Sequence, residues 1–300
     1  MSIGLALSGG GAKGLAHIGV IEALNDYGIN IDYIAGTSSG SIIASLYASG
    51  YTPNEMLEIV NVYKDKIVDI DRNVGFKLLG SLISKKVSIK GFVKGDKLEK
   101  ILKDVLYRKN IRDISDVKFP LAIPTVDLTT GEIVYFWNRE NRHTDCLIEE
   151  NVQYDDEPSY YSNGELASIV RASCSVPGIF VPKKLGGDFY VDGGVRVNTP
   201  VEVLKKMGAE KIIVVTFDCN KKPSFSIENV VGITSQAYNI MAHSSNIEEI
   251  NLADVNIHLC LNNVSLLDIS KATYVAKRGY DIVSRNINKI KEILGINKNM

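Results

Sequence analysis

Residues 3–28 read IGLALSGGGAKGLAHIGVIEALNDYG, and this stretch decides the fold. The first five residues form a short apolar run, which is typical of a buried strand. Three consecutive glycines follow, and after them apolar residues recur at four-residue spacing, at Ala16, Val20 and Leu24. That spacing predicts a helix, and Gly28 is placed to end it.

The segments that follow repeat this order. Residues 31–37 (IDYIAGT) are typical of a second strand, and residues 41–49 (SIIASLYAS) of a second helix. Two strand–helix units with short loops predict a parallel sheet covered by helices. Further segments with the same patterns include strands at 119–126, 132–137, 211–217 and 255–261, and helices that begin at Thr52, Asp96, Thr199 and about Lys271. We therefore predict one α/β domain over residues 1–300.

Composition indicates an ordinary globular protein. The chain has 300 residues, a net charge of −1, 45% hydrophobic residues and 23% charged residues, so nothing suggests a nucleic-acid partner. Four scattered cysteines without a CxxC pair predict neither a disulfide framework nor a metal site. The sequence has no apolar run of about 18 residues and no signal-peptide pattern. We expect a soluble, cytoplasmic protein.

Two segments interrupt the pattern of strands and helices. Residues 73–95 contain five lysines, no acidic residue and several bulky apolar residues, which suits a lid or a surface that contacts anionic lipid at a membrane. The alternative is an ordinary helix and loop whose apolar residues pack inward. Residues 138–163 are polar and rich in tyrosine, which predicts a surface insertion.

The glycine motif Gly9-x-Gly11-x-x-Gly14 follows a strand and opens a helix, as a dinucleotide-binding fingerprint does. That function also needs an acidic residue at the end of the second strand, and Asp32 lies at its start. A Walker phosphate loop is not formed either, because Lys13 is followed by glycine rather than by Ser or Thr.

A second motif, Gly36-Thr37-Ser38-Ser39-Gly40, lies between the second strand and its helix. This is the G-x-S-x-G context of a nucleophile elbow, and the Ser39 N–H can point at a developing oxyanion. The simpler alternative is that Ser38 or Ser39 caps the helix. Because loops after parallel strands open on the same edge, the glycine loop and Ser38 are predicted neighbours. Together they favour a serine hydrolase.

The general base is the third requirement of such a site. Asp192 ends a short strand in the stretch YVDGG, where partial desolvation could raise its pKa and make it a base. The alternatives are a simple turn aspartate, or a histidine base such as His243 or His258. The histidine contexts favour structural roles.

The ordered set of motifs resembles the patatin-like phospholipases over roughly residues 3–262. Residues 9–14 match G-G-G-x-[KR]-G, residues 36–40 match G-x-S-x-G, and residues 192–194 match D-G-[AG]. The resemblance implies an α/β, three-layer domain with a central, mainly parallel sheet flanked by helices.

The resemblance also implies the chemistry. It implies that Ser38 is the nucleophile and Asp192 the proton acceptor, with no catalytic histidine, cofactor or metal, and that the substrate is a phospholipid or another acyl ester. The remaining motif positions are the oxyanion loop and turn residues Gly9, Gly10, Gly11, Lys13, Gly14, Ser39, Gly36, Gly40, Gly193 and Gly194. The alternatives are a soluble carboxylesterase or thioesterase for short acyl chains, an inactive lipid-binding relative, and a nucleotide-binding protein.

Overall fold

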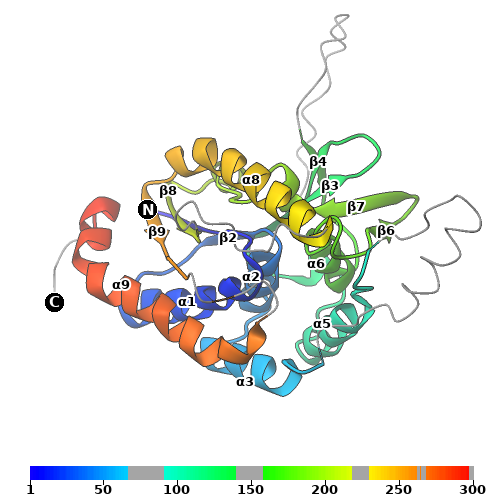
Figure 1. Ribbon diagram of the computed structural model, residues 1–300. Coiled ribbons are helices and arrows are strands. Elements are labelled where there is room, and N and C mark those ends of the chain that lie inside the picture. The colour runs from blue at the N-terminus through cyan, green and yellow to red at the C-terminus, as the bar shows by residue number, and fades with distance from the viewer. Residues whose placement is uncertain (67–90, 140–157, 218–229, 262–263, 265–267, 297–300) are drawn as a thin grey trace, which may run out of the picture.

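The computed structural model (Figure 1) describes residues 1–66, 91–139, 158–217, 230–261, 264 and 268–296. Its strands are β1 (Ile3–Leu7), β2 (Tyr33–Gly36), β3 (Leu121–Asp127), β4 (Ile133–Trp137), β5 (Ser159–Tyr161), β6 (Lys183–Leu185), β7 (Asp188–Asp192), β8 (Lys211–Thr216) and β9 (Val255–His258). Within the described residues these nine strands form one sheet in the order β5-β4-β3-β2-β1-β8-β9, with β7 paired to β3 and β6 to β7.

The centre of the sheet is parallel. Strands β3, β2, β1, β8 and β9 run in one direction, whereas β4 and β7 run antiparallel to β3. In this register Leu7 lies beside Gly36 on one side and Val215 on the other. The carboxyl ends of β1 and β2 therefore meet at one edge, so the glycine loop and the serine turn are neighbours, as predicted.

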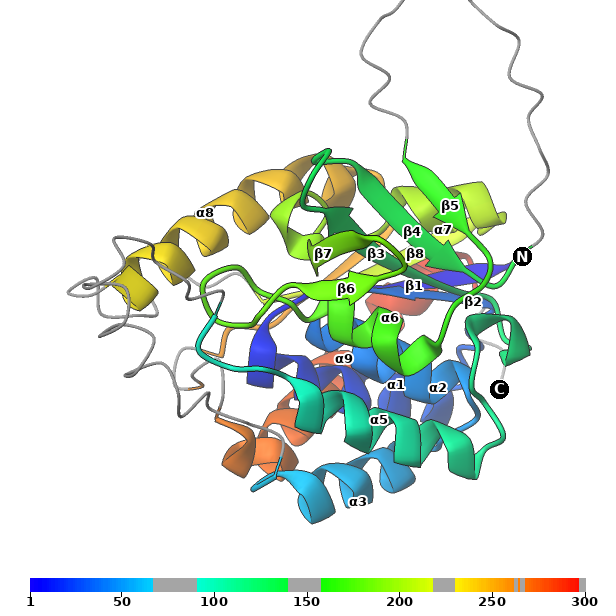
Figure 2. The same cartoon turned by 90° about the vertical axis from the view of Figure 1, so that its right-hand side faces the viewer.

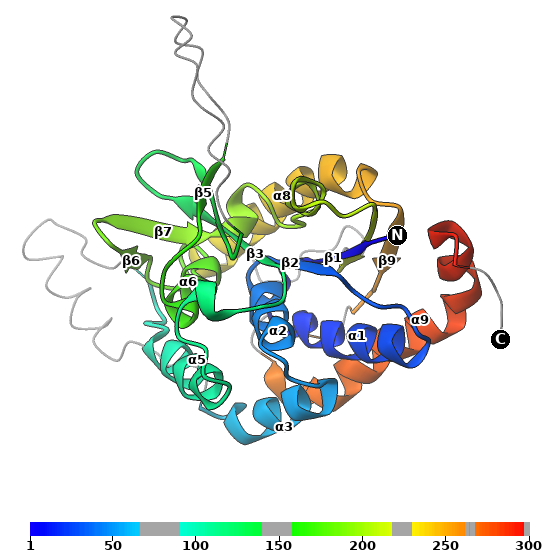
Figure 3. The same ribbon diagram turned by 180° about the vertical axis from the view of Figure 1, so that it is seen from behind.

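Helices cover both faces of the sheet. They are α1 (Ala16–Asp26), α2 (Ser39–Ala48), α3 (Pro53–Tyr63), α5 (Asp96–Arg108), α6 (Leu166–Ser173), α7 (Glu202–Met207), α8 (Val230–Asn251) and α9 (Ala272–Leu294). Figure 2 shows α7 and α8 on one face and α1, α2, α5, α6 and α9 on the other. Figure 3 shows α3 and α9 outside α1 and α2. The mainly parallel, helix-flanked sheet is confirmed.

The two faces of the sheet are packed differently because side chains alternate along a strand. Leu5 and Leu7 of β1 belong to the large core under α1 and α2, whereas Ala6 points to the other face. That other face carries alanines on three neighbouring strands, and the small side chains let α7 approach the sheet closely.

Side-chain hydrogen bonds to backbone N–H groups fix the starts of two helices. At α3 the expected start at Thr52 carries a capping box, with the Glu55 N–H donating to Thr52 Oγ1 at 3.3 Å and the Thr52 N–H donating to Glu55 Oε2 at 2.7 Å. At α7 the expected start at Thr199 is wrong. The helix begins at Glu202, where the buried Glu249 carboxylate of α8 accepts hydrogen bonds from the Val201 and Glu202 N–H groups, each at 2.8 Å. Burial raises the pKa of Glu249 to about 6.

The two interrupting segments are described in part. Residues 73–90 of the expected lipid-facing segment and residues 140–157 of the expected insertion lie outside the described residues. At the end of the first segment, Val93 is buried and bridges Phe180, so it packs inward. At the end of the second, Ser159–Tyr161 forms β5 and is part of the sheet. No helix within the described residues is long and apolar enough to cross a membrane.

Candidate active site

Ser38 occupies the turn between β2 and α2 in a strained conformation, with φ 53° and ψ −125°. A positive φ is uncommon for a residue with a side chain and is typical of functional turns. Neighbours hold this conformation: the Ser38 N–H donates to Ser173 Oγ at 3.0 Å, and the Gly40 N–H donates to the Thr37 carbonyl at 2.8 Å. The turn therefore has the geometry of the predicted nucleophile elbow.

Gly40 makes this tight turn possible. A methyl group on Gly40 would lie 2.2 Å from the Leu7 carbonyl oxygen, and one on Gly36 would lie 2.3 Å from the Gly40 carbonyl oxygen. These distances are far below van der Waals contact with backbone atoms that cannot move aside. Glycine at both positions lets the elbow fold directly against the end of β1.

The glycine loop lies beside Ser38. A methyl group on Gly9 would be 3.1 Å from Ser38 Cβ. The Gly9 N–H already donates to Asn198, at 3.2 Å to its carbonyl and 3.1 Å to Oδ1. Within the described residues, the N–H groups of Gly10, Gly11 and Ser39 have no hydrogen-bond acceptor. These three N–H groups are therefore not committed to another contact of the glycine loop or the elbow among the described residues.

The rest of the glycine motif joins the loop to the elbow. Gly14 packs on the start of α2, where a methyl group would lie 2.4 Å from Ser39 Oγ. Lys13 lies on the short 3-10 helix Gly11–Leu15, with its N–H donating to the Gly10 carbonyl at 3.3 Å and its side chain half-buried. This packing fixes the loop relative to Ser38.

Asp192 ends β7 and is completely buried. Its Oδ1 accepts hydrogen bonds from the Gly194 N–H at 2.8 Å and from Tyr238 Oη at 2.9 Å. Gly193 follows β7 and packs against the Pro124 carbonyl, while Gly194 packs against the Tyr238 hydroxyl. Burial raises the pKa of Asp192 to about 6, although hydrogen bonding by Ser38, Gly194 and Tyr238 opposes the rise. The carboxyl group can therefore accept a proton near neutral pH.

Ser38 and Asp192 are brought together from sequence positions 154 residues apart. The Ser38 side chain lies close enough to lower the pKa of Asp192. Asp192 Oδ2 is nevertheless buried without a partner at regular hydrogen-bond geometry among the described residues. The two side chains therefore lie near each other, without a hydrogen bond of regular geometry between them.

Asp32 and the three histidines among the described residues make other contacts. His17 is buried under the glycine loop with Nε2 2.9 Å from the Ser8 carbonyl, and burial lowers its pKa to about 4. His243 is exposed on α8, and His258 Nδ1 lies 3.1 Å from Thr216 Oγ1. Asp32 accepts a hydrogen bond from the Ile3 N–H at 2.7 Å, at the opposite end of β1 from the glycine loop. None of these three histidines is placed as a base for Ser38. Asp32 is not placed to bind a ribose at the glycine loop.

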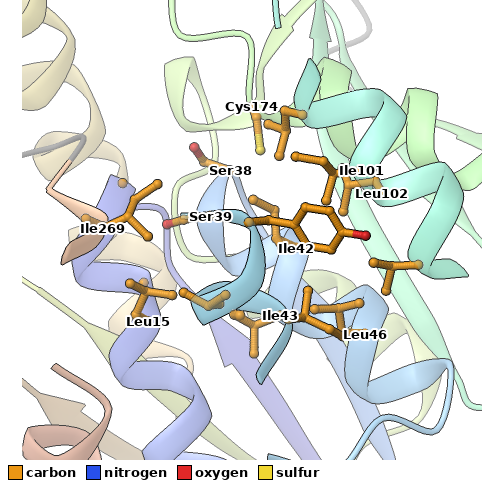
Figure 4. Close-up of a pocket in the computed structure, with 18 of the residues that line it drawn as sticks. Leu15, Ser38, Ser39, Ile42, Ile43, Leu46, Ile101, Leu102, Cys174 and Ile269 are labelled. Carbon is orange, nitrogen blue, oxygen red and sulfur yellow. The ribbon is translucent and has the colours of Figure 1, made fainter. Parts of the chain in front are cut away.

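An apolar cavity begins at Ser38 (Figure 4). Its volume is about 1060 Å³ with the open mouth included. Apart from Ser38 and Ser39, its lining is mainly apolar, with residues from the Gly11–Leu15 turn, α2, α3, α5 and the loop after α6. Cys174 also lines it, and burial raises the pKa of this thiol to about 12. Among the described residues, no group of three His, Cys, Asp or Glu side chains is arranged to hold a metal.

Three polar residues of the site were not predicted as contacts. Tyr238 on α8 binds Asp192, Asn198 holds Gly9, and Ser173 links the Ser38 N–H to the Pro124 carbonyl. None of the three lies within the motifs at residues 9–14, 36–40 and 192–194, so no local signal marks them. Each contact joins positions at least 46 residues apart.

Comparisons with known proteins agree with the motifs. The family model for patatin-like phospholipases matches residues 5–205. The uncharacterized protein YqhO of Bacillus subtilis is 33% identical, over 80% of each chain. Lysophospholipase NTE1 of Debaryomyces hansenii is 27% identical over 91% of this chain, which spans 16% of that longer protein. The solved structure of VipD from Legionella pneumophila is 16% identical, with a TM-score of 0.44, covering 96% of this chain and 66% of that one. The match over residues 5–205 shows that the chain belongs to the patatin-like phospholipase family, and at that level it is a lipid acyl hydrolase.

Proposed function

We propose that this protein hydrolyses fatty-acyl esters of phospholipids or related lipids, with Ser38 as nucleophile and Asp192 as base. The observation that carries the proposal is the strained elbow at Ser38 next to the buried carboxyl group of Asp192. A structural turn has no need for either feature. The apolar cavity beside the elbow supports an acyl substrate, because it offers contacts to methylene groups rather than to sugars or phosphates.

The first half of the reaction acylates the enzyme. Ser38 Oγ attacks the ester carbonyl carbon while its proton passes to Asp192. The tetrahedral oxyanion accepts hydrogen bonds from the N–H groups of Gly10, Gly11 and Ser39. When the intermediate collapses, the bond to the alcohol breaks, Asp192 returns the proton to the leaving oxygen, and the acyl group stays on Ser38.

The second half releases the fatty acid. Asp192 takes a proton from a water molecule, and the resulting oxygen attacks the acyl carbon through the same oxyanion site. The bond to Ser38 Oγ breaks, and the proton returns to Ser38. An aspartate can act directly in both halves because burial brings its pKa close to that of an ordinary histidine.

The substrate class follows from the relatives and the cavity. The curated relative in Debaryomyces hansenii is named a lysophospholipase, which favours a phospholipid or lysophospholipid substrate. The second candidate is a carboxylesterase or thioesterase for short acyl chains, and it rests on the same Ser38–Asp192 pair. Membrane contact through residues 73–95 is part of the proposal for a lipid substrate.

The deciding test is hydrolysis of p-nitrophenyl butyrate and of lysophosphatidylcholine, with chelator present, by wild type, Ser38→Ala and Asp192→Asn. Both variants are expected to lose at least about a thousandfold in kcat/KM, because each removes a group that is essential to both halves of the proposed reaction. Ser45→Ala is the matched control, since Ser45 lies on the same helix and its buried hydroxyl has no hydrogen-bond partner among the described residues. Retained folding is checked by circular dichroism.

Two results would overturn the proposal. One is a Ser38→Ala variant that keeps its activity. The other is an Asp192→Asn variant that stays active while His243→Gln or His258→Gln is inactive, because the base would then be a histidine.

A further inference from the structure

We infer that the apolar cavity holds one acyl chain along helix α2, and that Leu46 and Val105 at its far end limit the chain to about ten carbons. This inference rests on the proposed function, because it assumes that Ser38 carries the acyl group. It adds a property that neither the motifs nor the family match specify, namely the chain length.

Helix α2 supplies the first side of the cavity. Its lining residues are Ser38, Ser39, Ile42, Ile43 and Leu46, so one face of the helix follows the cavity from the reacting hydroxyl to its far end. Figure 4 shows Ser38 and Leu46 at opposite ends of this row. Ile43 and Leu46 are each 2% exposed, so the row ends in the closed core rather than in solvent.

Helix α5 supplies the opposite side. It contributes Leu98, Ile101, Leu102 and Val105, which recur at three- and four-residue spacing on one helix face. The start of α5 lies near the elbow, since Val93 bridges Phe180 of the loop that lines the cavity. Val105, at 1% exposure, lies one turn beyond Leu102 and therefore at the far end.

The far end is closed by contacts between helices. Tyr51 follows α2, and its hydroxyl donates to the Val105 carbonyl at 2.7 Å. Lys109, just after α5, donates to the Gly50 carbonyl at 3.4 Å and pairs with Glu55 of α3 at 3.1 Å. These bonds hold α2, α3 and α5 together beyond Leu46. A chain that reaches this point cannot continue without displacing them.

The length follows from helix geometry. Ser38 and Leu46 are eight residues apart, which is about 12 Å along a helix axis. Each carbon of an extended chain advances about 1.25 Å, since tetrahedral C–C bonds are about 1.5 Å long. The space between the reacting hydroxyl and Leu46 therefore accommodates about ten carbons.

The experiment measures kcat/KM for p-nitrophenyl esters from C4 to C16, in mixed micelles at fixed ester content. For wild type we expect a rise of about fourfold per added methylene up to about C10, as each methylene is buried, and no further rise beyond it. Leu46→Ala removes three carbons at the far end and is expected to move the break about two carbons longer. Val105→Leu adds one carbon there and is expected to move it about one carbon shorter.

The matched control is Leu106→Ala. Leu106 is the next residue on α5 and is 1% exposed, but it does not line the cavity. Its substitution tests whether loss of a buried leucine alone changes the profile, and the break is expected to stay at about C10. If Leu46→Ala fails to fold, the profiles of Val105→Leu and of wild type still test the chain-length limit.

The outcomes separate the two proposals. Activity that climbs steadily through C16 in wild type, or a break that stays in place in both cavity variants, overturns the chain-length limit while Ser38-dependent hydrolysis stands. Hydrolysis that persists in Ser38→Ala at every chain length overturns the proposed function itself. A break that moves in opposite directions in the two cavity variants supports the limit.

Discussion

Tyr238 donates a hydrogen bond from its hydroxyl to Asp192 Oδ1 at 2.9 Å, although the two residues are 46 positions apart in the chain. The same oxygen accepts the Gly194 N–H at 2.8 Å, so Oδ1 is held from two sides, whereas Oδ2 has no hydrogen-bond partner among the described residues. Through Tyr238, helix α8 thereby lowers the pKa of Asp192 on β7.

Removing this hydroxyl should change the pH dependence of catalysis. A hydrogen bond to the ionised carboxylate favours ionisation, so Tyr238→Phe is expected to raise the pKa of Asp192 further above about 6. The acid limb of kcat/KM for p-nitrophenyl butyrate then moves to higher pH. The variant loses activity several-fold at pH 6 and little at pH 8.5.

Tyr27→Phe is the control for that profile, because Tyr27 bonds to Ser284 on the far helix α9 at 2.6 Å. Its acid limb is expected to match that of wild type. An unmoved limb in Tyr238→Phe would show that this hydroxyl does not act on the reacting base.

Asp192 should also weaken the fold at neutral pH. Its pKa is about 6 in the folded protein and about 3.8 when exposed, so the folded state binds the extra proton between these values. Stability contributed by this residue is therefore present at low pH and falls as pH rises through 6. Asp192→Asn cannot ionise. As the pH rises from 4 to 8, the free energy of unfolding of this variant is therefore expected to increase by about 2–3 kcal/mol relative to that of wild type. Urea titrations at several pH values measure this difference, and parallel curves for the two proteins would contradict the prediction.

The elbow should tolerate no side chain at Gly40. Gly40→Ala places a methyl group 2.2 Å from the Leu7 carbonyl oxygen, and we expect a loss of more than about 3 kcal/mol in the free energy of unfolding, or failure to fold. Gly187→Ala is the control, since no atom lies within 4 Å of the added carbon, and a change of less than about 1 kcal/mol is expected. Equal urea midpoints for the two variants would refute the steric argument.

The capping box at α3 gives a smaller, local effect. Thr52→Ala removes the acceptor of the Glu55 N–H and is expected to lower the free energy of unfolding by about 1 kcal/mol. Thr52→Ser keeps the hydroxyl and should restore most of the loss. If the serine and alanine variants melt at the same temperature, the cap makes no contribution.

The sequence predicted those parts of the fold and site that depend on short-range patterns. The glycine loop after β1 and the elbow at Ser38 could be located because strand, glycines and helix follow within a few residues. Asp192 could be located because a strand ends at it and two glycines follow. Helix α2 begins at Ser39 rather than at the expected Ser41, because the turn residues themselves enter the helix.

The remaining features depend on contacts between distant segments. Helix α8 carries Ile240 and Met241, which are 58% and 49% exposed, so its apolar residues do not mark its buried face. Tyr238 was therefore not expected at the site. Likewise, the use of the Gly9 N–H by Asn198 depends on a contact across 189 residues, so the sequence could not show that this N–H is already occupied.

The burial of His17 has a consequence for acid tolerance. Its pKa is about 4 in the folded protein and about 6.5 when exposed, so the unfolded chain binds the extra proton in this interval, and stability falls as the solution is acidified. Asp192 has the opposite slope over nearly the same interval, because there the folded state holds the proton. His17, which lies under the glycine loop, and Asp192 therefore change the stability in opposite directions as the pH changes. The contributions of these two groups to the pH dependence of stability therefore largely cancel across the mildly acidic range, where either group alone would make stability depend steeply on pH.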